Sequence, residues 1–175
     1  MIGERIVNVI FDAGPLITAC KFKVQGKPII DYLSDKCRIM IAESVEEEVA
    51  ILGARYADGI VAGKRIVKGE IQVSPLNRYQ WQQIMANYAL GKGEKDSMEL
   101  CGQTDSGILI TDDYLAFIVA VRLGLKTRMM PDLIVDFAEM NKLTVEVAAS
   151  IIKAIQPRYQ VGVIEHNLTR LREMK

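Results

Sequence analysis

The chain has 175 residues, half of them hydrophobic and a quarter charged, which is the composition of a globular domain with a sizeable core. Its 22 basic and 22 acidic residues cancel, so the net charge excludes any argument from long-range attraction to nucleic acid, although a local basic face remains compatible with it. Three scattered cysteines argue against a disulfide framework, and with a single distant histidine they also argue against a zinc site. The N-terminal apolar run is too short for a secretory signal or a membrane span. We therefore expect a cytoplasmic protein with no membrane contact.

A run of apolar and β-branched residues from Ile6 to Phe11 ends at Asp12. A run this short and this apolar predicts a strand buried on both faces, as in a parallel sheet. Gly14 and Pro15 interrupt the pattern, so Asp12 is expected at the turn, and a helix is expected from Pro15 to Phe22. Ligands of open α/β sheets bind beyond the carboxyl ends of the strands, which makes Asp12 a candidate functional residue.

A second strand is predicted for residues 38–42, followed by a helix that Ser44 can cap. The apolar face of this helix consists of Val45, Val49 and Leu52. At about 100° per residue, Glu48 lies at the edge of that face, whereas Glu46 and Glu47 point away from it. The spacing leaves two interpretations of Glu48 open, an acid turned towards the interior and a solvated residue near a helix end.

Residues 53–69 show a weaker helical pattern with the densest basic group in the chain, which consists of Arg55, Lys64, Arg65 and Lys68. Such a group is more often a solvated helix face than a nucleic-acid contact, and the sequence is compatible with both.

Residues 70–74 predict a short strand, and Asn77 is expected to cap a helix that contains Trp81. Glycines at positions 91 and 93 end that helix. Glu94 and Asp96 then open the next one, where acids interact favourably with the helix dipole. Their spacing does not decide which of the two faces the interior.

Residues 107–111 predict a second strongly apolar strand, which runs into Asp112 and Asp113 just as the first strand runs into Asp12. Asp113 can also cap the helix that follows. A last short strand and three helices complete the pattern. Strands that alternate with helices predict a three-layer α/β/α fold with a central parallel sheet of four or five strands. We divide the chain into a domain of residues 1–143 and a helical C-terminal extension, residues 144–175, packed on the same domain.

If the two apolar strands are neighbours, Asp12 and Asp113 approach each other at the carboxyl edge of the sheet, where Glu48 and Asp96 can join them. Carboxylates gathered in one cleft repel each other, and a hard divalent cation removes that conflict. Oxygen ligands suit Mg²⁺ or Mn²⁺ better than zinc, and such an ion can activate water and hold a phosphate oxygen.

Four segments resemble the motifs of PIN-domain nucleases, in the branch related to VapC-type toxins. They are Val9-Ile10-Phe11-Asp12-Ala13-Gly14-Pro15-Leu16-Ile17, Ile41-Ala42-Glu43-Ser44-Val45-Glu46-Glu47-Glu48-Val49, Gly93-Glu94-Lys95-Asp96-Ser97-Met98 and Leu109-Ile110-Thr111-Asp112-Asp113. With the segment from Leu125 to Leu143, the resemblance covers roughly residues 6–143.

The resemblance implies a PIN-like fold and metal-dependent hydrolysis of RNA phosphodiester bonds, with Mg²⁺ or Mn²⁺ as the cofactor. The metal-binding acids that it implies are Asp12, Glu48, Asp96 and Asp113, with Glu94 and Asp112 as alternates. Thr111 would orient the site by hydrogen bonding. RNA is the implied substrate, and a protein antitoxin and a second copy of the chain are the protein partners to test.

The main alternative is a catalytically silent PIN-like module that binds RNA or protein. The neutral net charge favours it, as does the Ala13-Gly14 pair, where the family often has a hydroxyl group. A phosphoryl-transfer enzyme with an aspartate acceptor ranks lower, because Gly14 stands where such phosphatases usually have a second aspartate.

Overall fold

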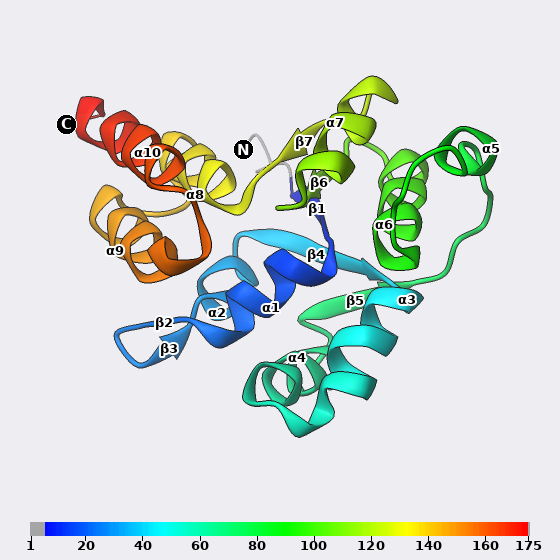
Figure 1. Cartoon of the computed structure of the whole chain (residues 1–175). Coiled ribbons are helices and arrows are strands. Elements are labelled where there is room, and N and C mark those ends of the chain that lie inside the picture. The colour runs from blue at the N-terminus through cyan, green and yellow to red at the C-terminus, as the bar shows by residue number, and fades with distance from the viewer. Residues whose placement is uncertain (1–5, 175) are drawn as a thin grey trace, which may run out of the picture.

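A five-stranded parallel sheet runs through the centre of the computed structural model, which describes residues 6–174 (Figure 1). Its strands are β1 (Val7–Phe11), β4 (Cys37–Ala42), β5 (Ile71–Ser74), β6 (Ile108–Ile110) and β7 (Thr127–Arg128). Their order is β5-β4-β1-β6-β7, and every neighbouring pair is parallel. With helices on both faces, this confirms the predicted three-layer α/β/α fold with a parallel sheet.

Helices cover both faces of the sheet (Figure 1). The helices α1 (Ala13–Lys21) and α4 (Ala57–Val67) pack against each other on one face, and α6 (Lys92–Gln103) contacts β1, β4 and β6 on the other. The chain leaves β1 towards β4 on one side and later returns to place β6 on the other side. This reversal of strand order beside β1 creates a crevice at the carboxyl edge, where ligands of such sheets bind.

The other segments are shorter or lie towards the C-terminus. They are the hairpin of β2 (Lys23–Val24) and β3 (Lys27–Pro28), α2 (Ile30–Leu33), α3 (Glu43–Glu46), a π-helical turn η1 (Glu47–Ile51), a 3-10 turn η2 (Leu52–Arg55), α5 (Gln82–Met85), α7 (Tyr114–Arg122), α8 (Met130–Glu139), α9 (Val145–Ile155), a 3-10 turn η3 (Gln156–Arg158) and α10 (Val161–Glu173). Within residues 6–174, every helix is too short or too polar to traverse a lipid bilayer.

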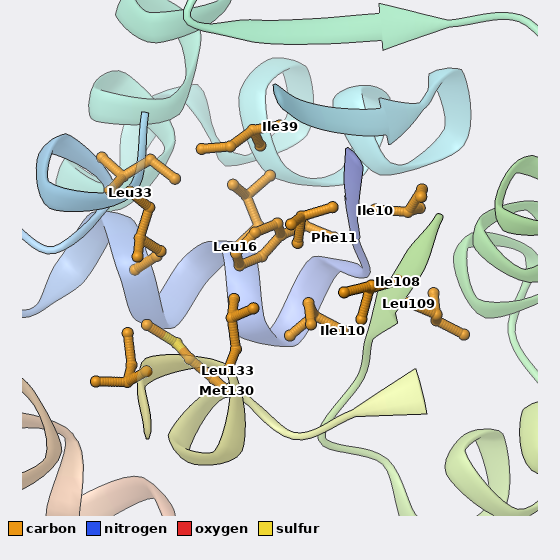
Figure 2. Packing of buried hydrophobic residues seen from close by; sticks show 14 of the residues in the cluster. Ile10, Phe11, Leu16, Leu33, Ile39, Ile108, Leu109, Ile110, Met130 and Leu133 are labelled. Atoms are coloured by element: carbon orange, nitrogen blue, oxygen red, sulfur yellow. The ribbon is translucent and has the colours of Figure 1, made fainter. Parts of the chain in front are cut away.

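The hydrophobic core is built around β1, whose Ile10 and Phe11 are fully buried because both faces of the strand are covered. Leu16 from α1 and Leu133 from α8 lie on the same side of β1 as Phe11, whereas Ile10 points to the opposite side (Figure 2). The C-terminal helices join this core through Ile151 of α9, and α8, α9 and α10 pack on one another. The division after residue 143 stays a prediction.

The helix expected after Asn77 is largely replaced by an irregular segment, with only α5 in regular form. The backbone N–H groups of this segment find partners on α6 instead of within a helix of their own. Asn77 N–H donates to Gln103 Oε1 at 3.0 Å, and Trp81 N–H donates to Glu99 Oε1 at 2.7 Å. Because these acceptors lie some twenty residues along the chain, local propensity could not reveal them.

Two glycines of α4 give a matched test of helix packing. A Cβ at Gly59 would lie 2.1 Å from the backbone oxygen of Gly53, whereas a Cβ at Gly63 would meet nothing within 4 Å. We expect Gly59→Ala to lower the free energy of unfolding by about 1–3 kcal/mol through overpacking against rigid backbone. Gly63→Ala should raise it by up to about 1 kcal/mol, since alanine favours the helix. Chemical denaturation measures both, and equal effects would contradict the close packing of α4 on η2.

Candidate active site

A pocket of about 570 Å³ opens at the carboxyl edge of the sheet, beside the point where the strand order reverses. Six acidic residues line it: Asp12, Glu47, Glu48, Glu94, Asp112 and Asp113. They come from the ends of β1 and β6, from the turn η1 and from the start of α6. The sheet thus brings together the acids that follow its two most apolar strands.

Asp12 is the most buried of these acids, with 6% of its surface exposed. It caps α1, with Oδ1 accepting the Ala13 N–H at 2.8 Å, and its Oδ2 accepts the Thr111 hydroxyl at 3.0 Å. Burial raises the pKa of Asp12 to about 6; the two hydrogen bonds oppose this rise, and the charges of Glu94 and Glu48 add to it. Asp12 is therefore a fixed carboxylate in surroundings that disfavour its charge.

Glu48 faces Asp12 across a space that Gly93 leaves open. A Cβ at Gly93 would lie 3.5 Å from Glu48 Oε2 and 3.9 Å from Asp12 Oδ1. Glu47 also lines the pocket, and both Glu47 and Glu48 are exposed there. An exposed Glu47 agrees with the prediction that it points away from the apolar face of the helix. It is the first residue of the π-helical turn η1. No local signal in the sequence marks this turn.

The structure separates the two acids at the start of α6. Glu94 lines the acidic pocket, and its Oε2 accepts the Gly91 N–H at 2.6 Å, which is the acid's half of a capping box. Asp96 lines a different pocket, together with Lys95 and Glu99. Two positions along a helix are separated by about 200° around its axis, which accounts for the separation of the two carboxyl groups.

Asp112 and Asp113 both line the pocket but have different surroundings. Asp112 Oδ1 accepts the Met130 N–H at 3.3 Å, and Oδ2 accepts the Tyr159 hydroxyl at 2.6 Å. Burial raises the pKa of Asp112, and these hydrogen bonds oppose the rise. Asp113 is exposed and caps α7, accepting the Ala116 N–H at 2.8 Å. Tyr159 has no signal in the local sequence around the acids, because it lies 47 residues beyond Asp112.

The four basic residues singled out in the sequence lie away from this pocket. Arg65 pairs with Asp31 through two hydrogen bonds and with Glu70, so its guanidinium joins α4 to α2 and to the loop before β5. The Arg55 guanidinium lies over the Tyr56 ring, and Lys64 and Lys68 line a separate, mostly apolar pocket. Within residues 6–174, the cation that lines the acidic pocket is Lys92.

The pocket suits a metal ion through the kind of atoms that line it. Between residues 6 and 174, no three acidic, histidine or cysteine side chains are close enough together to form a finished metal site. The donors are nevertheless carboxylate oxygens, which suit hard divalent cations, and Gly93 leaves room between two of them. The Ser44 hydroxyl adds a buried oxygen at the pocket wall that has no hydrogen-bond partner in the described part of the chain. We conclude that the types of donor atom in the pocket suit a hard divalent cation.

Comparison with known proteins assigns a family. A family model described as "DUF3368: PIN domain" matches residues 8–173, which takes in β1 at one end and α10 at the other. No curated protein matches the chain. One solved structure, "A domain of a functionally unknown protein from Methanocaldococcus jannaschii DSM 2661", is 18% identical over 71% of this chain and 91% of that chain, with a TM-score of 0.46. On the family match, the chain belongs to the PIN-domain family described as DUF3368.

Proposed function

We propose that the chain is a Mg²⁺- or Mn²⁺-dependent ribonuclease that hydrolyses RNA phosphodiester bonds in the acidic pocket. PIN domains are in general nucleases, and they typically use divalent metal ions. One observation of this chain carries the proposal: six acids from separate segments surround a single pocket, with the buried Asp12 at its base. Such a concentration of negative charge is unfavourable unless a cation balances it.

Asp12, Glu48, Glu94 and Asp113 are the residues that would hold the ion. When bound, a divalent ion lowers the pKa of a coordinated water and stabilises negative charge on a phosphoryl oxygen. The protein contributes fixed donors. Thr111 and the start of α1 orient Asp12, and the Gly91 N–H orients Glu94. Such preorganisation limits the rearrangement that substrate binding would otherwise require.

Asp112 has a bracing role in this proposal. Its Oδ1 accepts the N–H of Met130, the first residue of α8, and its Oδ2 accepts the Tyr159 hydroxyl, so Asp112 joins the C-terminal segment to the pocket. Asp113 is exposed at the pocket, and among the described residues only its Oδ1 accepts a hydrogen bond, as the cap of α7. We assign the ligand role at the end of β6 to Asp113 on its exposure, since a carboxylate oxygen that accepts one hydrogen bond, as in Asp12, still has a lone pair for a metal ion.

Matched substitutions test the choice between Glu94 and Asp96. Glu94→Gln keeps an oxygen for the capping box but loses the negative charge, so we expect the Mn²⁺ concentration for half-maximal RNA cleavage to rise at least about tenfold. Asp96→Asn should leave that concentration unchanged. The measurement is cleavage of a labelled RNA over a Mn²⁺ titration. The reverse result would assign the ligand role to Asp96.

The second candidate is a silent module that binds RNA or protein. The observation that favours it is the lack of a finished metal site among residues 6–174. Calorimetric titration with Mn²⁺ at neutral pH separates the two proposals, because a nuclease site must bind the ion and a silent module need not. Absence of binding heat, together with no RNA cleavage, would favour the silent module.

The proposed protein partners are an antitoxin and a second copy of the chain. We also propose that the protein acts on RNA in the cytoplasm. Large apolar side chains are exposed along η1, η2 and α4: Ile51, Leu52, Tyr56, Ile60 and Val67. Such an exposed group supports a protein partner on this face.

A further inference from the structure

A second pocket adjoins the acidic one. It has a volume of about 360 Å³, and Lys92 lines both pockets, so they share a wall at the start of α6. The ring of Tyr79 and the side chains of Lys95 and Asp96 also line the second pocket. A substrate lying across the acidic pocket therefore has a neighbouring cavity that contains an aromatic ring and two cations.

The segment that carries Tyr79 is fastened to α6 on both sides of that residue. Glu99 is 2% exposed and accepts the N–H groups of Gln80 at 2.8 Å and Trp81 at 2.7 Å. On the other side, the Arg78 guanidinium donates to the Gly102 oxygen at 3.2 Å. A buried carboxylate is unfavourable unless hydrogen-bonded, and here it is satisfied by the backbone of this segment.

Tyr79 itself remains 60% exposed although its neighbours are held. An aromatic ring on a fixed backbone loses little conformational entropy when a ligand stacks on it. The fastening thus does not bury Tyr79 in the core. It holds the ring beside the second pocket.

Two acids, Asp96 and Glu99, and two cations, Lys92 and Lys95, line this pocket, and the Glu99 carboxylate already accepts two backbone N–H groups. The two lysines are three positions apart on α6, which places them on neighbouring parts of its surface. Among residues 6–174, neither ammonium group makes an ion pair. Unpaired cations beside an exposed aromatic ring are the combination that binds single-stranded nucleic acid, through phosphate and base respectively.

We propose that the second pocket binds the nucleotide next to the scissile phosphate, with its base stacked on Tyr79 and its phosphate paired with Lys92 and Lys95. This proposal rests on the proposed function, because cleavage in the acidic pocket defines which phosphate is the neighbour. It adds a substrate-binding subsite built from α6 and the segment before α5.

Binding of a fluorescent single-stranded RNA of about eight nucleotides tests the subsite separately from catalysis. The full-length chain with Asp12→Asn serves as the parent, in chelator, with fluorescence anisotropy as the readout. We expect Tyr79→Ala to weaken binding about five- to tenfold and Tyr79→Phe to bind as the parent does, since stacking needs only the ring. Lys95→Gln should reduce the slope of log Kd against log salt by about 0.7.

Two exposed residues elsewhere provide matched controls. Tyr56, the residue that follows η2, is 54% exposed, and Lys153 is exposed on α9. Tyr56→Ala and Lys153→Gln should leave RNA affinity unchanged. Equal affinities for Tyr79→Ala and Tyr56→Ala would overturn the proposal, as would a parent protein that binds no RNA. Equal binding of single-stranded DNA of the same sequence would support a nucleotide subsite that does not read the ribose.

Cleavage kinetics separate failure of this proposal from failure of the proposed function. If no metal ion supports cleavage but RNA binding depends on Tyr79, the nuclease mechanism is wrong and the subsite stands. If the chain with Asp12 intact cleaves RNA with Mn²⁺ and Tyr79→Ala leaves KM unchanged, the subsite is wrong and the nuclease stands. With both correct, Tyr79→Ala raises KM about five- to tenfold and changes kcat little.

Discussion

Asp12→Asn is expected to lower metal-dependent RNA cleavage by at least about a hundredfold and, at the same time, to make the metal-free protein more stable at neutral pH. The loss of activity follows from removing a fixed anionic donor at the base of the pocket, where a loss of roughly 3 kcal/mol or more of transition-state stabilisation is typical. Asparagine can keep its oxygen as the acceptor for the Ala13 N–H, and its amide N–H can donate to the Thr111 hydroxyl, which is also an acceptor. Asparagine then keeps a similar position but lacks the negative charge and the second acceptor oxygen.

The gain in stability follows from the sign of the pKa change. Asp12 has a pKa of about 6 in the folded chain against an ordinary value of 3.8, so the folded state binds the proton more tightly than the unfolded state. Its contribution to stability is complete below pH 3.8 and is lost as the pH rises through about 6. At neutral pH the charged carboxylate therefore destabilises the fold by up to about 3 kcal/mol, and asparagine removes this penalty.

Thr111→Val is expected to lower the stability that Asp12→Asn raises. It keeps the Asp12 charge but removes one of the donors that stabilise it, so the free energy of unfolding at neutral pH should fall by about 1.5–3 kcal/mol. Thermal and urea unfolding in chelator, from pH 4 to pH 8, compare the variants with the original chain. If Asp12→Asn has the same stability as the original chain across this range, or cleaves RNA at its rate, the role given to Asp12 is wrong.

The sheet was predictable because short apolar runs that alternate with helical patterns have few arrangements available. Asp12 could be singled out because a buried strand ends at it, and the same reasoning singled out the Asp112-Asp113 pair. These predictions depend on local patterns and on one general rule about where parallel sheets bind ligands. They therefore placed these acids at the carboxyl edge of the sheet, where the structure also has them, without knowledge of any long-range contact.

Other features depended on contacts that a single sequence does not reveal. The sequence left Arg65 as part of a solvated helix face or of a nucleic-acid contact, whereas in the structure it forms an ion pair with Asp31, 34 residues away. The π-helical turn η1, in which Glu47 and Glu48 lie beside the pocket, has no signal in the local sequence. For Glu94 and Asp96, the choice depends on how α6 is rotated on the sheet, and core packing sets that rotation.

The hydroxyl of Tyr159 links the C-terminal segment to the acidic pocket, and Tyr159→Phe is expected to lower the free energy of unfolding by about 2 kcal/mol at neutral pH. The hydroxyl donates to Asp112 Oδ2 at 2.6 Å, and its loss leaves a largely buried, charged oxygen without that partner. Burial and the neighbouring Asp112 raise the pKa of Tyr159, so the phenol stays a donor throughout the accessible pH range.

The pH dependence of this loss distinguishes a charged partner from a neutral one. Burial already raises the pKa of Asp112 in the folded chain, and removal of the Tyr159 donor raises it further. The variant therefore loses most stability where Asp112 is ionised, and the loss shrinks as the pH falls and the carboxyl group becomes protonated. Tyr32→Phe is the matched control, because the Tyr32 hydroxyl donates at 2.8 Å to the uncharged backbone oxygen of Val24. Its loss should be about 1 kcal/mol at every pH. If the two variants show the same pH dependence in urea unfolding, Asp112 is not the charged partner that fastens the C-terminal segment to the edge of the sheet.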